Sequence, residues 1–560
     1  MTEATSPLHQ ARKHLDTADR LVAKSLSWIK AASTSGGGLS GDLLDQHQLA
    51  CFDLAWCEAE LTAGRFAIEY AEQVAKAREP VGSEVNLEEQ ITLAFCAEAL
   101  LNIRNRLWAR PDNFGLADDD LAALIAPEIR AFCQQQLDAK TLAALGRRVI
   151  ALNGASGAYM LNHDAAMMQD SFRKFAITVV MPLAEKIHRE DMLIPPEILG
   201  PLTEMGCFGL SIPERYDGIQ SDDHEDNMGM IVVTEELSRG SLGGAGSLIT
   251  RPEILSRALL KGGTEEQRKK WLPRLAAAEP LCAVAVTEPN TGSDVAAVKL
   301  KATKCDGGWI LEGAKTWCTM AGKAGVLLVL ARTNADIKPI HRGLSLFLVE
   351  KDSFDGHDFE YRQAQGGVMT GRAIATIGYR GMHSYEVFFD HFFVPDENLV
   401  GGPAGEGQGF YYQMAGFAGG RIQTAARATG VMQAAFERAV SYSQERQVFG
   451  KPIGDYQLTL VKLARMATLL TVSRQFTYAV GRLMDQGKGQ MEASMVKLFT
   501  CRTSEWLTRE AMQIHGGMGY AEESPVSRYF LDARVLSIFE GAEETLALKV
   551  IARALVESAQ

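Results

Sequence analysis

A carboxylate near the end of the chain has the setting expected of a catalytic base. Glu540 stands between Phe539 and Gly541, where a loop leads into a helix. A carboxylate held in an apolar cavity has a raised pKa, which a general base that works near neutrality requires. We therefore expect Glu540 to remove a proton, whereas Glu543 and Glu544 suit the first turn of the following helix, where the helix dipole favours acids.

Two other segments could hold a flat ligand. Residues 284–294 are typical of a strand that runs into a polar turn. Residues 313–319 contain Trp317, Cys318 and Thr319, and in a strand the first and last of these side chains share one face while Cys318 points away. Each segment also has an ordinary interpretation. The first can be a simple junction of a strand with a turn, and the second can be a packed tryptophan beside an incidental threonine. The functional alternative for the second segment is that its indole and hydroxyl both face one flat heterocycle.

Two polar segments that contain glycine follow later in the chain. Residues 445–451 read Glu-Arg-Gln-Val-Phe-Gly-Lys, and residues 513–520 include Gly516 and Gly517, a pair that permits a ligand to approach the backbone closely. The glycines of residues 401–409 do not lie in a βαβ unit, so they predict a loop that joins domains and disfavour a classical dinucleotide-binding fold. The HExxH, GxSxG and P-loop patterns are missing, and we predict no metal site.

Composition and charge narrow the class of protein. At roughly 150 residues per domain, the 560 residues suggest about three or four domains. The hydrophobic share of 46% and the charged share of 22% are those of an ordinary globular protein. With 57 basic and 69 acidic residues the net charge is -12, which disfavours a general electrostatic hold on nucleic acid or anionic lipid.

Cysteine use and apolar runs bear on the compartment. The nine cysteines include no CxxC pair, which is typical of thiols in a reducing compartment and not of a disulfide framework or a zinc site. Apolar runs such as residues 324–331 are much shorter than the roughly 20 residues of a membrane helix, and the N-terminus has no export pattern. We therefore expect a cytoplasmic protein that binds no membrane.

The elements that must position these residues follow a helical, helical, β, helical order. Residues 8–152 read as helices, with Leu43, Ala50, Leu54, Cys57 and Leu61 on one face and a break at residues 33–41. A second helical stretch covers residues 164–275. Residues 281–400 contain six short β-rich runs and the hairpin signal Asp306-Gly307-Gly308, and helical spacing returns after Gly409. The β-rich runs are 284–287, 299–303, 309–312, 326–331, 344–349 and 387–394.

Five of these segments together resemble the acyl-CoA dehydrogenase family over roughly residues 164–555. Its motif VTEPxxGSD matches residues 286–294, KxWIT matches 315–319 with Cys318 for Ile, ERxxFGK matches 445–451, QxxGGxG matches 513–519, and YEGT matches 539–542 with Ala542 for Thr. The resemblance implies a mainly α fold with a central β domain. We expect an N-terminal helical extension (1–158), a helical domain (159–279), a β-barrel-like domain (280–402) and a C-terminal four-helix bundle (403–560).

The resemblance implies FAD as the cofactor. It places the flavin between the β domain and the C-terminal helices, with Thr319 near N5, and it has the partner subunit hold the adenine end, so that a homodimer or homotetramer is expected. The residues that it assigns to FAD are Val284, Val286, Thr287, Trp317, Cys318, Thr319, Arg446, Phe449, Tyr456, Gln457, Gln513, Gly516 and Gly517.

The resemblance also implies a reaction. Glu540 would remove the α proton of an acyl-CoA thioester while a hydride leaves the β carbon for the flavin, and electrons would pass on to electron-transfer flavoprotein. Hydrogen bonds to the thioester oxygen would stabilise the developing enolate. Substrate contacts are expected from Ser293, Arg421 and Gly541. Some relatives carry the base on a preceding helix, but that position falls near Gly420, which has no side chain.

The whole chain, including residues 52–56 of the unusual N-terminal extension, resembles a branch of the family that oxidises (2S)-methylsuccinyl-CoA to mesaconyl-CoA, and this resemblance implies that substrate. A buried carboxylate at the far end of the acyl group needs a cation, for which Arg251 is the first candidate and Arg427 the second. The alternatives are an isobutyryl-, isovaleryl- or glutaryl-CoA dehydrogenase, an acyl-CoA oxidase, and a non-enzymatic DNA-binding relative. Trp317 beside Thr319 favours a shielded flavin over an oxidase, and the net charge disfavours binding to DNA.

Overall fold

The computed structural model describes residues 6–77 and 86–560. Residues 1–5, where an export pattern would begin, and residues 78–85 of the expected N-terminal block lie outside the described residues. The chain divides into two compact units. Unit 1 comprises Met1–Asp164, Val431–Leu483 and Gly487–Gln560, and unit 2 comprises Ala165–Gly430 and Met484–Gln486. The N-terminal extension therefore shares a unit with most of the C-terminal helices.

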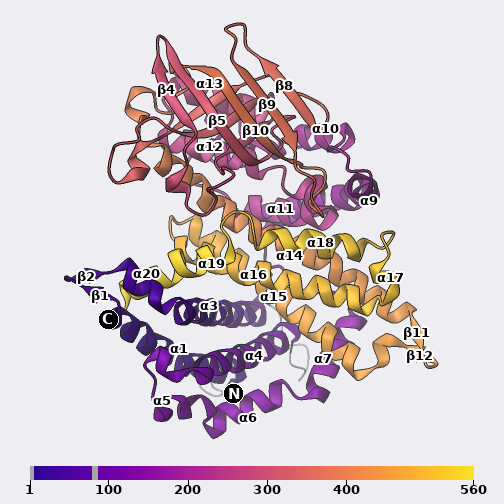
Figure 1. The fold of residues 1–560 in the computed structure, drawn as a ribbon. Helices are drawn as coiled ribbons and strands as arrows, with labels where there is room; N and C mark the ends of the chain where they lie inside the picture. The colour runs from indigo at the N-terminus through magenta and orange to yellow at the C-terminus, as the bar shows by residue number, and fades with distance from the viewer. Residues whose placement is uncertain (1–5, 78–85) are drawn as a thin grey trace. The chain divides into compact units, whose positions relative to one another are not determined.

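An eight-stranded sheet forms the centre of unit 2 (Figure 1). Its strand order is β3-β6-β4-β5-β10-β9-β8, and β7 pairs with β6. The pairs of β6 with β3 and β4 are parallel, and the other pairs are antiparallel. The strands are β3 (Cys282–Ala285), β4 (Lys301–Cys305), β5 (Gly308–Thr319), β6 (Val326–Arg332), β7 (Leu344–Glu350), β8 (Asp358–Arg362), β9 (Val368–Ala373) and β10 (Ser384–Pro395).

The six β-rich runs of the sequence each overlap a strand. The expected hairpin is confirmed, because Cys305 pairs with Gly308 and leaves Asp306 and Gly307 as a two-residue loop. Gly307 takes a φ of 74°, which glycine adopts without strain. Strands β8 and β9 were not expected, because their sequences bury only alternate residues such as Phe359 and contain no continuous apolar run.

Strand β6 is buried on both faces. Leu327, Val329 and Ala331 pack into the core on one side, while Val326, Leu328 and Leu330 pack against helices on the other. This double burial explains why the strand reads as an unbroken apolar run. The covering helices are α12 (Thr250–Gly262) and α13 (Glu265–Ala276), which lie behind the sheet in Figure 1.

Other helices complete unit 2. Helix α13 begins where the Thr264 hydroxyl accepts from the Gln267 N–H and the Gln267 amide oxygen accepts from the Thr264 N–H, which satisfies two otherwise free donors. The remaining longer helical segments are α8 (His163–Phe175), η5 (Ala176–Val180), α9 (Met181–Arg189), α10 (Pro196–Glu204), α11 (Asn227–Gly240), η8 (Leu242–Gly246) and the first part of α14 (Gly409–Glu445).

Unit 1 is helical. Its N-terminal segments are α1 (Pro7–Ala32), α2 (Gly41–Leu44), η2 (Asp45–His47), α3 (Gln48–Ala77), α4 (Leu87–Ala109), α5 (Asp118–Ala122), α6 (Pro127–Gln136) and α7 (Ala139–Ala151). Its C-terminal segments are α15 (Gln457–Met484), α16 (Gln490–Ile514), α17 (Gly517–Tyr520), α18 (Pro525–Leu536), α19 (Glu543–Thr545), η14 (Leu546–Ala552) and α20 (Arg553–Ser558). The predicted break at residues 33–41 is occupied by a small hairpin of β1 (Thr34–Ser35) and β2 (Gly38–Leu39).

Helix α3 lies between α1 and α16 in unit 1 (Figure 1). Leu54, Cys57 and Leu61 are fully buried along it, as their spacing predicted, whereas Leu43 belongs to α2. Helix α3 also packs against η14. The N-terminal extension is thus built into the same core as the C-terminal helices.

Candidate active site

Thr287 is fixed beside the strand that carries Trp317. Val284 is half-buried in β3, Val286 is buried just after it, and Thr287 begins the polar turn. The backbone N–H of Thr316 donates to the Thr287 carbonyl over 2.9 Å. The structure therefore brings together two of the predicted segments, while Ser293 is exposed farther along the turn.

A buried ion pair reinforces this junction. The Lys315 Nζ donates to the Val286 carbonyl over 2.8 Å and to the Glu288 Oε1 over 2.9 Å. The Glu288 carboxylate also accepts from the backbone N–H groups of Lys299 and Leu300, each over 2.7 Å. Burial lowers the pKa of Lys315, and the negative charge of Glu288 opposes that shift. Every oxygen of the carboxylate thus has a donor, as a stable buried pair requires.

Trp317 sits in a bulge, which corrects the simple alternation expected of its strand. Tyr385 pairs with Cys318 and Val387 with Lys315, so β5 has one residue more than β10 between these pairs. Trp317 has a φ of 57° and its indole is 55% exposed, whereas Thr319 is buried. Period-two spacing therefore cannot assign these two side chains to one face. The bulge turns a large aromatic ring outward from a strand that is otherwise mostly buried.

The side chains next to Trp317 are buried and polar or polarisable. The Thr319 and Ser384 hydroxyls lie 3.0 Å apart, and either can donate. Burial raises the pKa of Cys318 to about 12, while the positive charges of Lys315 and Arg251 act in the opposite direction. Arg251 is buried in α12 and also lowers the pKa of Cys282, which burial raises. The field of Arg251 therefore reaches the strand that carries the predicted flavin contacts.

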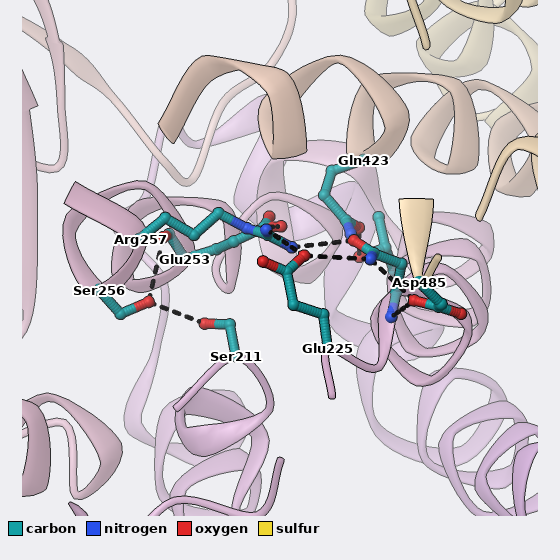
Figure 2. A network of polar contacts seen from close by, with 9 residues as sticks. Ser211, Glu225, Glu253, Ser256, Arg257, Gln423 and Asp485 are labelled. Atoms are coloured by element: carbon teal, nitrogen blue, oxygen red, sulfur yellow. Dashed lines mark hydrogen bonds and ion pairs between the residues drawn. The ribbon is translucent and has the colours of Figure 1, made fainter. Parts of the chain in front are cut away.

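A network of charged groups joins α12 to neighbouring segments of unit 2, and Figure 2 shows Arg257 within it. Arg257 donates to the Glu253 Oε1 over 3.0 Å, to the Glu225 Oε2 over 2.6 Å and to the Asn227 Oδ1 over 2.8 Å. Two carboxylates thus neutralise this guanidinium. A Cβ atom on Gly419 of α14 would lie 2.5 Å from the Glu253 Oε1, so a larger residue there would displace the carboxylate.

Two further arginines lie on α14. Arg427 is fully buried and donates to the Ser247 hydroxyl over 3.2 Å and to the Thr424 hydroxyl over 2.6 Å. The charge of Arg427 also lowers the pKa of Glu253, although burial is the dominant influence and raises it. Arg421, the predicted CoA contact, is half-buried. Unit 2 thus gathers several cations along α12 and α14.

Glu540 lies in a loop with unusual backbone geometry in unit 1. Its φ is 54°, and that of Gly541 is 98°. A non-glycine residue in the left-handed region costs free energy and persists only where the surroundings hold it. A side chain at Gly541 would be strained at this φ, and its Cβ would lie 2.9 Å from the Leu546 Cδ2. The loop therefore fixes the half-buried Glu540 in one strained conformation.

Helix α16 holds the residues that follow Glu540. The Lys497 Nζ is buried and donates to the Gly541 carbonyl over 2.6 Å. The Arg502 Nε donates to the Glu543 Oε2 over 3.0 Å. Glu543 and Glu544 do stand in the first turn of α19, as expected. Buried Glu543, however, is ion-paired with Arg502, so its role extends beyond the helix dipole.

The predicted segment 445–451 forms an exposed hairpin in unit 1. Strands β11 (Gln447–Val448) and β12 (Lys451–Pro452) pair, and Phe449 at the tip has a φ of 49° and is 96% exposed. The Tyr456 hydroxyl donates to the Val448 carbonyl over 2.8 Å and so supports the hairpin. Arg446 and Gln457 are exposed. An aromatic tip held this far into solvent suits contact with another molecule.

The predicted segment 513–520 lies at the end of α16. Gln513, Gly516 and Gly517 are exposed, and a Cβ on either glycine would meet nothing within 4 Å. His515 stacks on Tyr442 with ring centroids 4.3 Å apart, and Tyr442 lies near the end of α14, just before the hairpin. The structure therefore links these two predicted ligand segments through one aromatic pair.

One group of side chains in the described residues could ligate a metal ion. Asp191, His357 and His383 offer ligand atoms within 4.8 Å of one another. The Arg380 Nε lies 3.4 Å from the Asp191 Oδ1, however, and so already neutralises this carboxylate. The group belongs to an ion-pair cluster and gives no ground for a metal cofactor.

The side chains of the predicted segments suit a flavin dinucleotide. Trp317 offers an exposed flat ring, and Thr287 and Thr319 offer hydroxyl groups from the neighbouring turn and from the same strand. In unit 1, the exposed Arg446 could pair with a diphosphate, and the open backbone at Gly516 could lie against a nucleotide. This donor set matches the ring and the phosphates of FAD, although the two sets lie in different units.

Sequence reasoning missed several supporting residues. Lys315 and Glu288 belong to the family motifs, but their ion pair was not predicted, although a lysine within an apolar strand indicates a buried partner. Lys497 and Arg502 carry no such local signal, because their partners lie about 40 residues away, on the loop after Glu540 and in the first turn of α19.

No helix in residues 6–77 and 86–560 is both long and apolar enough to cross a membrane. All nine cysteines lie in the described residues and are free thiols.

Comparisons with known proteins agree with these features. Family models match the N-terminal domain (residues 162–279), the middle domain (283–392) and the C-terminal domain (407–556) of acyl-CoA dehydrogenase. The chain is 39% identical over 554 residues to (2S)-methylsuccinyl-CoA dehydrogenase of Cereibacter sphaeroides, which covers 97% of both chains. It is 34% identical over 407 residues to the mitochondrial 2-methylacyl-CoA dehydrogenase of Solanum tuberosum, covering 71% of this chain and 92% of that one.

A solved structure gives the same result. Butyryl-CoA dehydrogenase of Megasphaera elsdenii superimposes with a TM-score of 0.64 at 30% identity, and the match covers 71% of this chain and all of that one. The expected fold class, mainly helical with a central sheet, is confirmed. With three family domains in order and relatives of this similarity, the chain belongs to the acyl-CoA dehydrogenase family of FAD-dependent oxidoreductases.

Proposed function

We propose that this protein oxidises (2S)-methylsuccinyl-CoA to mesaconyl-CoA. The main support for this proposal is the similarity to (2S)-methylsuccinyl-CoA dehydrogenase, because this similarity extends over 97% of the chain and so includes the N-terminal extension. The 2-methylacyl-CoA relative matches only 71% of the chain. The extension is therefore shared with a relative that acts on this dicarboxylic thioester.

Glu540 is the proposed base. Its carboxylate takes the α proton of the thioester, and the electron pair left behind forms the new double bond as the β hydrogen departs with its own pair. Bound FAD supplies the acceptor for that hydride. The backbone N–H of Glu540 would donate to the thioester oxygen and stabilise the negative charge that develops there. The strained loop that holds Glu540 supports this role, because strained backbone clusters at active sites.

The proposed flavin contacts are those of the two predicted sets. The residues proposed to serve the ring system are Val284, Val286, Thr287, Trp317, Cys318 and Thr319. The Lys315–Glu288 pair joins β5 to the turn that follows β3. Arg446, Phe449, Tyr456, Gln457, Gln513, Gly516 and Gly517 would serve the diphosphate and adenosine of FAD in a second copy of the chain. The fully exposed hairpin tip supports this assignment and a homodimer or homotetramer.

Arg251 is the proposed partner of the substrate's free carboxylate. It is buried, and its charge is felt at Cys318, next to the proposed flavin contacts Trp317 and Thr319. Arg257 is less suitable, because Glu253 and Glu225 already neutralise it. Arg427 remains the second candidate, since it is buried among hydroxyl groups. Ser293, Arg421 and Gly541 are proposed to contact the CoA thioester.

We also propose the cytoplasm as the compartment and electron-transfer flavoprotein as the acceptor of the electrons. A solved structure titled for the electron-transferring flavoprotein of Acidaminococcus fermentans matches 71% of this chain with a TM-score of 0.64. If electron-transfer flavoprotein is the acceptor, it should reoxidise the reduced enzyme faster than oxygen does. Equal yields of hydrogen peroxide and reduced acceptor would instead indicate an oxidase.

A substrate comparison tests the proposed function. The yellow holoenzyme is mixed without oxygen with methylsuccinyl-, isobutyryl-, isovaleryl- or glutaryl-CoA, and the bleaching of the flavin absorption is followed. We expect the fastest bleaching with methylsuccinyl-CoA. Faster bleaching by either uncharged acyl group would remove the dicarboxylic assignment, and no bleaching by any of the four would contradict the activity itself.

A further inference from the structure

The N-terminal extension reaches the segments that flank Glu540. Helix α3 of the extension packs against α16 and η14 within unit 1, and η14 begins six residues after Glu540. Lys549 of η14 also pairs with Asp45 of the extension over 2.7 Å. The family models begin only at residue 162, so these contacts come from a part of the chain outside them.

One chain of contacts runs from the extension to the loop that carries Glu540. The Trp56 side chain on α3 is buried, and the guanidinium carbon of Arg502 lies 5.6 Å from its ring centroid. Arg502 in turn donates to Glu543, three residues after Glu540. The electrons of an indole ring attract a guanidinium that lies over it, and the ring also limits where the guanidinium can move.

The ring of Trp56 is itself fixed from within the extension. The guanidinium carbon of Arg106 on α4 lies 5.8 Å from the same ring, and the Arg106 Nη1 donates to the Glu60 Oε2 over 2.6 Å. Two helices of the extension thus orient the surface on which Arg502 rests. Without that surface, the half-exposed Arg502 side chain would have many rotamers open to it.

The loop that carries Glu540 and Gly541 needs contacts with its neighbours to keep its conformation. Glu540 and Gly541 both have positive φ, and such backbone persists only when neighbouring groups determine it. Lys497 holds the loop at the Gly541 carbonyl, and Arg502 holds it at Glu543. Lys497 is buried within α16, whereas Arg502 is half-exposed and lies over Trp56 of the extension.

We propose that Trp56 and Arg502 are positioning residues through which the N-terminal extension sets the geometry of the Glu540 loop. The proposal rests on the proposed role of Glu540 as the base. A misplacement of about 1 Å can slow an enzymatic step on the order of 100-fold, so loss of this contact should slow removal of the α proton without removing the base.

The test isolates proton removal from hydride transfer. In 3,3-dimethylsuccinyl-CoA, with the thioester carbon numbered 1, the β carbon bears no hydrogen, so the α hydrogens can exchange with D2O but no oxidation can follow. Exchange is followed by NMR with holoenzyme of the wild type and of Arg502→Met, Trp56→Leu and Trp56→Phe. The flavin spectrum, the dissociation constant of the same thioester and the thermal midpoint are measured in parallel.

A matched control breaks another contact between the extension and the C-terminal helices. Arg465 of α15 donates to Glu98 of α4 over 2.9 Å and lies over Trp506, with its guanidinium carbon 4.1 Å from the ring centroid. Arg465→Met therefore removes an ion pair and a cation–π contact of the same kind. Its partners are on α4 and α16 and not in the loop after Glu540.

We expect Arg502→Met and Trp56→Leu to lower the exchange rate about 10- to 100-fold, with the thioester dissociation constant and flavin spectrum close to those of Arg465→Met. Trp56→Phe, which keeps a ring, should recover most of the rate. If Arg502→Met and Trp56→Leu both exchange the α hydrogens as fast as Arg465→Met does, the proposal is wrong. If Arg502→Met does not bind flavin, the two Trp56 variants decide.

Glu540→Gln separates the two hypotheses. If this variant exchanges the α hydrogens as fast as the wild type, the base is another residue and the proposed function is wrong in that respect. If it abolishes exchange while Arg502→Met and Trp56→Leu match the control, the base is confirmed and the positioning role of the extension is rejected.

Discussion

The β5 junction of unit 2 and the Glu540 loop of unit 1 are held in different ways. At the junction, strand pairing, a backbone hydrogen bond and the buried Lys315–Glu288 pair fix neighbouring residues of one sheet. At the loop, a strained backbone is held by side chains of a distant helix, and Arg502 is largely exposed. The junction therefore resists change through burial, whereas the loop can be adjusted by its surroundings.

This difference predicts different responses to substitution. The arginine of the Arg502–Glu543 pair is half-exposed, so the pair is closer to the solvent-exposed ion pairs, which contribute about 0–1 kcal/mol to the stability of a fold. Removing one partner of a buried pair costs about 3–5 kcal/mol. Changes at the loop should therefore affect the reaction more than the stability, and changes at the junction should affect both.

Removal of the base should have the largest effect. Glu540→Gln is nearly isosteric, so we expect it to keep bound FAD and to bind the thioester. Turnover should fall about 1,000-fold or more, because a positioned general base contributes on the order of 100- to 10,000-fold. The measurement is anaerobic flavin bleaching by methylsuccinyl-CoA. Turnover within tenfold of the wild type would show that another group takes the proton.

Breaking the buried pair of the junction should have the next largest effect. Lys315→Met leaves the Glu288 carboxylate buried without its cation, so we expect a loss of about 3–5 kcal/mol in the free energy of unfolding. The visible spectrum of the bound flavin should change as Thr287 and Trp317 shift. Denaturant unfolding provides the measurement.

The double variant Lys315→Met, Glu288→Gln is the control for this prediction. It removes the uncompensated charge, so it should recover part of the lost stability. If the single variant is as stable as the wild type and the double variant is not, the pair does not hold the junction.

Substitution of Arg251 should have a smaller and more selective effect. A hydrogen bond to a charged group is worth about 1.5–3 kcal/mol, so Arg251→Met should raise KM for methylsuccinyl-CoA on the order of 10- to 100-fold. KM for isobutyryl-CoA should change little, because that acyl group has no second carboxylate. KM for the same two substrates is also measured with Arg427→Met, because Arg427 is the second candidate. A selective loss in Arg427→Met alone would transfer the role to that residue.

The smallest expected effect concerns pH and the Gly516 loop. Burial lowers the pKa of His515 below its ordinary value of 6.5. Below that value the unfolded chain binds a proton that the folded chain takes up less readily, so folding stability rises with pH through this window and is lost as the pH falls. His515→Gln should weaken the loss of stability between neutral and mildly acidic pH. Thermal unfolding of both proteins across this pH range checks the prediction. If the variant has the same pH profile as the wild type, the prediction is wrong.

Local sequence patterns were sufficient to predict the family and the order of the helical and β regions. Short motifs and periodic apolar positions such as Leu54 and Leu61 report local structure, which depends on neighbouring residues in the chain. Local patterns also identified the hairpin at Gly307 and the proposed base Glu540. Each of these rests on residue types that are close together in sequence.

The contacts that support the predicted sites come from long-range packing and could not be predicted from local sequence. The bulge at Trp317 arises from the pairing of β5 with β10, and no rule of alternation foresees an extra residue. The contact of Trp56 with Arg502, and of Arg502 with Glu543, joins three segments separated by tens to hundreds of residues. Long-range packing and desolvation select such partners, and they act only once the chain has folded, so their physical basis is absent from local sequence.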